Sequence, residues 1–414
     1  MNERLPADSF DQSILNREIN PDRLREIGGA AFVAGDKVLK QIECNFTNFS
    51  YHNIDHTEAI EVSATTFVQG FMEPYGYSQE QKILTAQATK FSAQIHDAIV
   101  IATKAKENSD SIGSFTARNR GWRNESEPWS GGNEYQSFLL GVRYVLEELI
   151  DDLPTNASDQ EVYEVHNDLK KADPTYRYFM DEVEDGVRVT VPAVVVDTFP
   201  EGTTLDFGDV DARDYLFHAN GQYSGLRIYQ PHLLNPKGEP PQSLTGLSMA
   251  TADIKACGYV DDAERFFAIG DKEMLESKYQ IAINLDRALR GELTDSEAFD
   301  ELLNEIDGWI QSQVGFVLWQ KLDHEKVKKQ HPALAQNPDR AAAFDEKLSY
   351  FDSHIVAAAR RADEFARLKD GLLESEGSVQ DKAERVLAFL QLGDKPDEVV
   401  AKARAYAESL PAAA

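Results

Sequence analysis

Apolar residues recur at near-helical spacing along most of this 414-residue chain. The segment from Pro21 to Cys44 shows the pattern, and after Asn133 it becomes a continuous stripe of Phe138, Leu139, Val142, Val145, Leu146 and Leu149. A 3.6-residue repeat places such side chains on one face of a helix, where they pack on neighbouring helices. The spacing therefore predicts a mainly α-helical protein.

The same spacing predicts further helices on both sides of a less helical middle region. They are expected at about 53–69, 78–101, 243–256, 272–291, 295–323, 338–369 and 378–410. Residues 102–132 are polar and rich in Gly and Ser, which predicts a long loop.

Residues 170–245 form the least helical part of the chain. The run VRVTVPAVVVDTF is β-branched and predicts an extended segment that Pro192 interrupts. We therefore expect residues 1–275 to form one helical domain with an irregular or extended insertion at about 170–245. Residues 276–414 are expected to form a C-terminal helical extension packed on that domain.

The charge balance restricts the partners of the protein. With 71 Asp and Glu against 42 Lys and Arg, the formal net charge is −29. An extended nucleic acid or an anionic membrane requires clustered Lys and Arg, so neither is expected as a partner. The charged N-terminus has no apolar signal region, and Cys44 and Cys257 are expected to be reduced, which together indicate a cytoplasmic protein.

Three short strings carry the chemistry of a metal site. The first contains His52 and His56, which lie on one face if the segment is helical, because four residues are about one turn. The second is the doublet His96-Asp97 in an apolar helix, and the third is Asp253 among apolar and small residues. Imidazoles and carboxylates are ligands for divalent metals such as Mn, Fe, Co, Ni and Zn.

Each string by itself fits an ordinary surface or core role, but their joint order resembles the HD-domain superfamily of metal-dependent phosphohydrolases. The opening string Tyr51-His52-Asn53-Ile54-Asp55-His56 is similar to that of HD enzymes related to cyclic-nucleotide phosphodiesterases. The resemblance implies an α-helical bundle that binds one divalent metal ion. The candidate metals are those named above and Mg. The implied function is hydrolysis of a phosphate ester or anhydride in a nucleotide or another small phosphorylated molecule.

The resemblance also assigns roles to residues. It implies that the metal ligands are His56, His96, Asp97 and Asp253, and that His52 donates a proton to the leaving oxygen. Glu134 follows the long loop, with a serine three residues later as in some small HD proteins, and could orient or deprotonate the attacking water. The alternative for Glu134 is a first-turn acid favoured by the helix dipole.

Cations gather in the long loop between the doublet and Glu134: Lys104, Lys106, Arg118, Arg120 and Arg123. They suit either a basic lid over a phosphate or a solvated loop with scattered charge. Elsewhere, Arg360-Arg361 is expected to be exposed charge, and the face formed by Trp309, Gln313, Phe316 and Trp319 is expected to pack in the core.

The chain departs from two branches of the family. It lacks the histidine that follows the doublet in cyclic-nucleotide phosphodiesterases and the Glu-Asp pair of alarmone hydrolases, so a single metal is expected. Two other functions stay open: a non-catalytic HD protein that binds a metal or a partner, and a di-iron oxygenase, for which His218 and His232 are the nearby candidate ligands. The substrate and the oligomeric state, including a homo-oligomer, are not decided by the sequence.

Overall fold

The computed structural model of the chain describes residues 9–45, 53–72, 76–99, 102–103, 117–118, 133–151, 153–154, 157–189, 193–198, 206–207, 210–211, 217–219, 222–229, 243–253 and 263–409. Within these ranges the protein is mainly α-helical, which confirms the predicted fold class. None of the described helices is long and apolar enough to cross a membrane.

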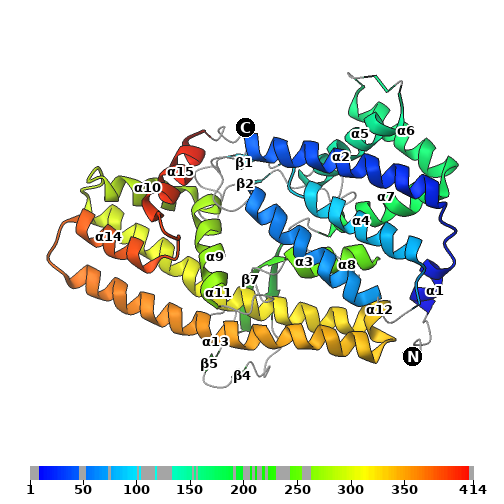
Figure 1. Ribbon diagram of the computed structural model, residues 1–414. Coiled ribbons are helices and arrows are strands. Elements are labelled where there is room, and N and C mark those ends of the chain that lie inside the picture. Colours follow the sequence, from blue (N-terminus) through cyan, green and yellow to red (C-terminus); the bar gives the residue numbers. More distant parts are fainter. Residues whose placement is uncertain are drawn as a thin grey trace.

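The helices of the first part of the chain surround α4. They are α1 (Ser9–Leu15), α2 (Pro21–Asn45), α3 (Ile54–Met72), α4 (Gln79–Ile95), α5 (Asn133–Leu149), α6 (Asp159–Ala172), α7 (Pro174–Arg188) and α8 (Leu244–Asp253). Helix α4 packs against α2, α3, α7 and α8, and α3 also packs against α8 (Figure 1). Both α3 and α8 were predicted from the sequence pattern, and any continuation of α8 past Asp253 lies outside the described residues.

Serine caps begin two of these helices. Ser78 accepts a hydrogen bond from the backbone of Gln81, whose side chain binds back to the Ser78 amide, and Ser158 forms the same reciprocal box with Glu161. Such boxes satisfy amides that the first turn leaves unpaired. The Gln81 side chain also donates to the Ile14 carbonyl, so it ties α4 to the end of α1.

Glycines in α2 allow a close approach of α4. A Cβ on Gly28 would collide with the side-chain amide of Gln87, and a Cβ on Gly35 would collide with that of Gln94. The two glycines and the two glutamines are each seven residues apart, about two helical turns. The Gly28-Gly29 pair, which interrupts the apolar pattern in the sequence, continues the helix, and Gly28 leaves room for the side chain of Gln87.

The extended region is shorter than predicted. Helix α7 and the end of α6 occupy 170–188, which the sequence analysis assigned to the insertion, so that boundary was wrong. Asp173 explains the continued helix, since its side chain caps α7 by accepting from the amides of Thr175 and Tyr176. A predicted strand is present, and it begins directly after Pro192.

The strands of the described ranges form three small antiparallel sheets. In the largest, β7 (Gln222–Tyr229) lies between β3 (Ala193–Thr198) and β6 (Phe217–Ala219), with Val195 opposite Arg227 and His218 opposite Tyr223. The others are two-stranded: β1 (Ala102–Thr103) with β2 (Ala117–Arg118), and β4 (Asp206–Phe207) with β5 (Val210–Asp211).

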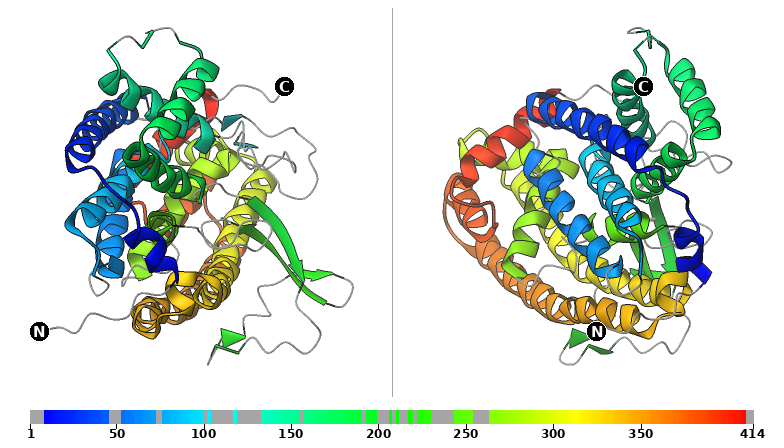
Figure 2. Two further views of the ribbon diagram at one scale, coloured as in Figure 1. Left: turned by 90° about the vertical axis from the view of Figure 1, so that its right-hand side faces the viewer. Right: turned by 45° about the vertical axis from the view of Figure 1, so that its right-hand side comes forward.

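The C-terminal helices form a long antiparallel pair and a small cluster at one end of it. They are α9 (Ala263–Ser277), α10 (Tyr279–Leu289), α11 (Ser296–Gln330), α12 (Pro332–Ala335), α13 (Pro338–Glu374), α14 (Val379–Phe389) and α15 (Pro396–Ser409). Figures 1 and 2 show α11 and α13 side by side, with α10, α14 and α15 at one end of the pair. Two predicted helices are each divided, 272–291 at Lys278 and 378–410 at the loop containing Gly393, whose φ of +85° suits glycine.

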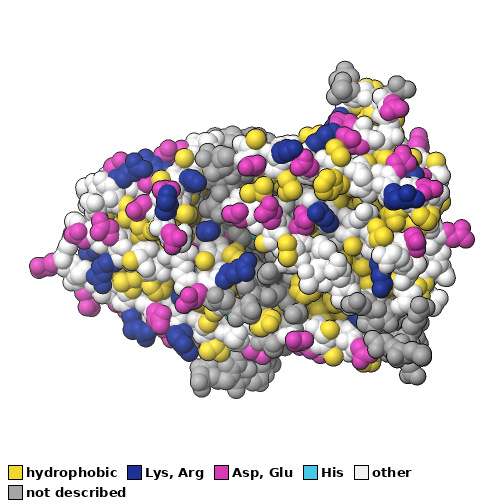
Figure 3. Space-filling model, in the orientation of Figure 1, with side chains coloured by type: hydrophobic (Ala, Val, Ile, Leu, Met, Phe, Trp, Pro, Cys, Tyr) yellow, Lys and Arg dark blue, Asp and Glu magenta, His cyan; other side chains and the backbone are white. Residues whose placement is uncertain are grey.

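The long helix pair shares one core with the first part of the chain. Phe71 of α3 and Leu247 of α8 belong to the same buried cluster as Val317 of α11 and Phe351 of α13. Residues from both sides of residue 275 therefore build the core that supports α3 and α8. On the face drawn in Figure 3, Lys and Arg side chains are interspersed with Asp and Glu.

Arg361 corrects a prediction about charge. Only Arg360 of the Arg360-Arg361 pair is exposed, whereas Arg361 is 4% exposed and its guanidinium lies 2.5 Å from a carboxylate oxygen of Asp271. It also donates to Gln313, which is buried as expected for the predicted apolar face. A single residue in a helical pattern gives no sign that its partner lies 90 positions away.

His166 is a buried neutral histidine. It lies in α6 with 1% exposure, and its Nδ1 is 2.9 Å from the hydroxyl of Tyr176. Burial raises the pKa of Tyr176, so this hydroxyl keeps its proton and can donate it to Nδ1. Burial, assisted by the charge of Lys170, lowers the pKa of His166 to about 3.

We expect this histidine to weaken the fold in mild acid. Below pH 6.5 the unfolded chain protonates His166 and the folded chain does not, so the free energy of unfolding should fall by about 2 kcal/mol between pH 6.5 and 5. Urea unfolding of the wild type and of His166→Gln at both pH values measures this contribution. The variant should show the smaller loss, and equal losses in the two proteins would contradict the assignment.

Candidate metal centre

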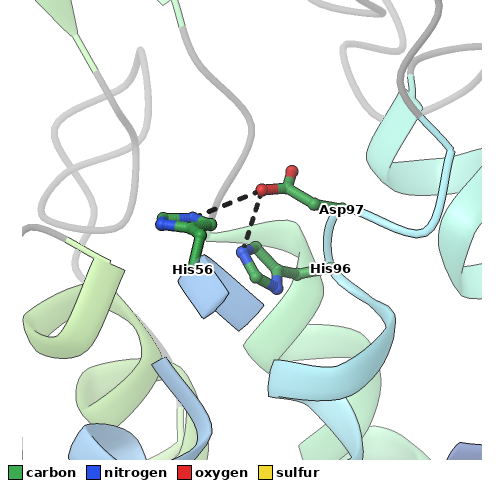
Figure 4. Close-up of side chains that lie close together, drawn as sticks. All are labelled: His56, His96 and Asp97. Carbon is green, nitrogen blue, oxygen red and sulfur yellow. Dashed lines mark ion pairs between the residues drawn. The ribbon is translucent and has the colours of Figure 1, made fainter. Parts of the chain in front are cut away.

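Ends of three helices meet at the candidate centre. His56 lies in the first turn of α3, His96 directly follows α4, and Asp253 is the last residue of α8. Figure 4 shows the side chains of His56, His96 and Asp97 converging, with the Asp97 carboxylate between the two imidazoles. Small residues beneath them, among them Ala64, Ala93 and Ala250, belong to a buried cluster that brings the three helices together.

Asn53 starts the helix that carries His56. Its side-chain oxygen accepts a hydrogen bond of 3.1 Å from the His56 amide, while its backbone carbonyl accepts from the amide of Thr57. This is an N-cap, which orients the first turn of α3. The Asn-x-x-His spacing was part of the resemblance in the sequence, and the N-cap preference of asparagine could have identified the role of Asn53.

The His96-Asp97 doublet follows the helix and does not lie inside it, so the predicted helix 78–101 ends too late. His96 still donates its amide to Ser92, but Ala98 bonds three residues back, to Ile95. The Ile99 amide then donates to the hydroxyl of Ser137 in α5, at 2.9 Å. The bond to Ser137 therefore stabilises a turn that ends the helix, and in this turn Asp97 faces His56.

The polar atoms of the site are within a few ångströms of one another. Oδ2 of Asp97 is 3.1 Å from Nε2 of His96 and 3.5 Å from Nε2 of His56, and Oδ1 of Asp253 is 3.9 Å from Nε2 of His56. His56, His96 and Asp97 each offer a ligand atom within 4.8 Å of the others. In the described ranges no other group of three His, Cys, Asp or Glu side chains meets so closely.

Nε2 of His96 has the orientation expected of a metal ligand. Nδ1 lies 2.8 Å from the Ala93 carbonyl, which favours the tautomer with the proton on Nδ1 and the lone pair on Nε2. Nε2 is buried and lies 3.1 Å from Oδ2 of Asp97, so two atoms that can bind a metal face each other.

The local field favours a cation. Burial, the largest influence, lowers the pKa of His96, but the carboxylates of Asp97 and Asp253 and the Ala93 carbonyl raise it to about 9 overall. Helices α4 and α8 also direct their C-terminal ends, which carry partial negative charge, at the site. The donor set and the field together fit a divalent ion.

Several predicted residues cannot be placed at the site. His52, Lys104, Lys106, Arg120, Arg123 and His232 lie outside the described residues, and of Glu134, Arg118 and His218 only the backbone is described. Glu134 belongs to the first turn of α5, three residues before Ser137. The predicted roles of His52 and Glu134 therefore stay predictions. His56, His96 and Asp97 come together, and Asp253 lies 3.9 Å from His56, outside that group of three.

Comparison of the chain with protein-family models, with curated proteins and with solved structures finds no match.

Proposed function

We propose that this protein is a metal-dependent phosphohydrolase of the HD type, acting on a nucleotide or another small phosphorylated molecule. The observation that carries the proposal is the meeting of His56 with the His96-Asp97 doublet, whose ligand atoms lie within 4.8 Å of one another, with Asp253 3.9 Å from His56. Their order along the chain is the one that resembles the HD superfamily. Two imidazoles and two carboxylates suit a single divalent ion.

The chemistry of a phosphate ester suits such a centre. A divalent ion held by these four residues would neutralise charge on a phosphoryl oxygen and lower the pKa of water toward 7. The Ala93 carbonyl holds the His96 ring in its ligand orientation, and Asn53 fixes the turn that presents His56. The groups that would orient the proposed metal ligands are therefore backbone and side-chain groups of this chain.

His52 and Glu134 complete the proposed machinery. His52 would protonate the departing oxygen, a role that typically contributes on the order of 10²–10⁴-fold in rate. Glu134 would orient or deprotonate the attacking water from the first turn of α5, the helix that Ser137 ties to the doublet. Cations of the 102–132 segment would offset the charge of the phosphate in this acidic protein.

Elemental analysis and a phosphatase screen test the proposal. Purified protein is analysed for bound metals, stripped with a chelator, reloaded with Mn²⁺, Co²⁺, Ni²⁺ or Mg²⁺, and assayed for phosphate release from nucleotides and sugar phosphates. We expect one metal per chain and release that requires it. Metal should also stabilise the fold, and the free energy of unfolding should rise by about 2.7 kcal/mol when the metal concentration is one hundred times Kd. The unfolding temperature should rise accordingly.

Two outcomes would contradict the proposal. Two irons per chain with dioxygen-dependent turnover would favour an HD-type oxygenase. A protein that takes up no metal and releases no phosphate would instead favour a non-catalytic binding protein.

A further inference from the structure

The helices that carry His56 and Asp253 lie side by side in opposite directions. The start of α3 meets the end of α8 at the site, and farther along Ile60 packs with Ala250 in the small cluster beneath the centre. At the far ends, Phe71 of α3 and Leu244 of α8 share the large core. The separation of the two candidate ligands therefore depends on how far each helix is advanced along its own axis.

Carboxylates of α7 hold the far end of α8. Oδ2 of Asp185 accepts from the amide of Ser243 at 2.9 Å and from its hydroxyl at 2.6 Å, and Oε2 of Glu182 accepts from the amide of Thr245 at 3.3 Å. These are among the first amides of the helix, which have no partner within it, and the dipole favours negative charge there. Helix α8 is thus capped by its own Ser243, whose hydroxyl accepts from the Gly246 amide, and by carboxylates of the neighbouring helix α7.

The Glu182 carboxylate is buried and paired. It is 1% exposed, and its second oxygen accepts from the guanidinium of Arg17 at 2.7 Å. A buried carboxylate that lost such a partner would strongly destabilise the fold. Arg17 lies between α1 and α2, so three separate segments meet at the start of α8.

Arg340 holds the far end of α3. It is 2% exposed, belongs to α13, and donates from Nε to the Phe71 carbonyl at 2.8 Å and from Nη2 to the hydroxyl of Tyr77 at 3.4 Å. The last carbonyls of a helix have no partner within it, and a cation is favourable beside them. Both helices are therefore held at the ends remote from the centre by buried charges of the appropriate sign.

We infer that Glu182, Asp185 and Arg340, which we call the distal clamp, are positioning residues that set the axial placement of α3 and α8 and so the geometry of the metal centre. The inference rests on the proposed function. One residue of helical advance is 1.5 Å, whereas metal–ligand distances tolerate about 0.2 Å, so a small slip of α8 would spoil the site. The distal clamp also gives the C-terminal part of the chain a role, because Arg340 comes from α13 of that part.

Cobalt provides the test, since its visible spectrum reports coordination as well as binding. Glu182→Gln keeps the shape of the side chain but removes its charge, and we expect the Kd for Co²⁺ to rise about 10–100-fold, with an altered visible band. Ser243→Ala removes one bond of Asp185 together with the bond that the hydroxyl accepts from the Gly246 amide, and it serves as a second variant if Glu182→Gln does not fold. Its Kd should rise by a smaller factor in the same direction.

Asp271→Asn is the matched control. Asp271 is also a buried carboxylate paired with an arginine, Arg361, but it lies in α9 and contacts neither α3 nor α8 in the described residues. The control should lose stability while keeping the wild-type Kd and spectrum. Unchanged Co²⁺ binding in the clamp variants, or equal weakening in the control, would overturn the inference alone. A wild-type protein that binds no Co²⁺ would overturn the proposed function and this inference with it.

Discussion

Asp97→Asn should abolish stoichiometric metal binding and lower metal-dependent phosphate release by about 10³-fold or more. The Asp97 carboxylate lies between the two imidazoles, 3.1 Å from His96 and 3.5 Å from His56, so one substitution removes the group shared by the candidate ligands. A bound metal typically supplies several kcal/mol of transition-state stabilisation, and each 1.36 kcal/mol is a factor of ten in rate. The amide is nearly isosteric with the carboxylate, so packing should be preserved.

Asp55→Asn is the control for this experiment. Asp55 is an exposed acid in the first turn of α3, next to His56, and the substitution changes the net charge by the same amount. Metal content by elemental analysis and turnover under saturating Mn²⁺ are measured for both variants. If Asp97→Asn retained a full complement of metal and turned over like Asp55→Asn, Asp97 would not be a ligand.

Arg361→Leu should lower the free energy of unfolding by about 3–5 kcal/mol. The substitution leaves the Asp271 carboxylate, which is 0% exposed, without its cation, and an uncompensated buried charge costs this much. It also removes the guanidinium from between the rings of Phe267 and Phe389, which lie 4.7 and 5.3 Å away. Burial already raises the pKa of Asp271, and loss of Arg361 should raise it further, so the destabilisation should shrink as pH falls.

Urea unfolding followed by tryptophan fluorescence measures this effect. Trp309 is a nearby reporter, since its indole donates to the carbonyl of Gly270, adjacent to Asp271. The double variant Asp271→Leu with Arg361→Leu should recover much of the loss, because an apolar pair needs no compensation. A single variant within about 0.5 kcal/mol of the wild type, the range of an ordinary surface substitution, would show that the pair contributes little.

Local patterns predicted the helices and the members of the candidate centre. Periodicity located α3 and α5 because each buries one face, and this signal lies within a single helix. Helix α8 is instead buried along nearly its whole length. The candidate ligands were predicted for a related reason, since their residue types are rare together and keep a recognisable order. Asn53 could also have been identified, because an N-cap bonds only three residues ahead.

Other features depended on contacts that no local pattern contains. The His96-Asp97 turn forms because Ile99 bonds to Ser137, 38 residues away. Glu182 caps α8 across 63 residues, and Arg340 reaches Phe71 across 269. Charged residues of this kind are usually exposed, so their burial could not be inferred from residue type.

The amino-acid sequence alone thus determined that the protein is mainly helical and which side chains are candidates to hold a cation. Only the tertiary structure decided where α4 ends, how α3 and α8 are aligned, and which charges are buried. The physical reason is the distance along the chain over which each effect acts. Periodicity and capping act within one or two helical turns. The separation of candidate ligands from different helices depends on how those helices pack and on the buried charges that hold their ends.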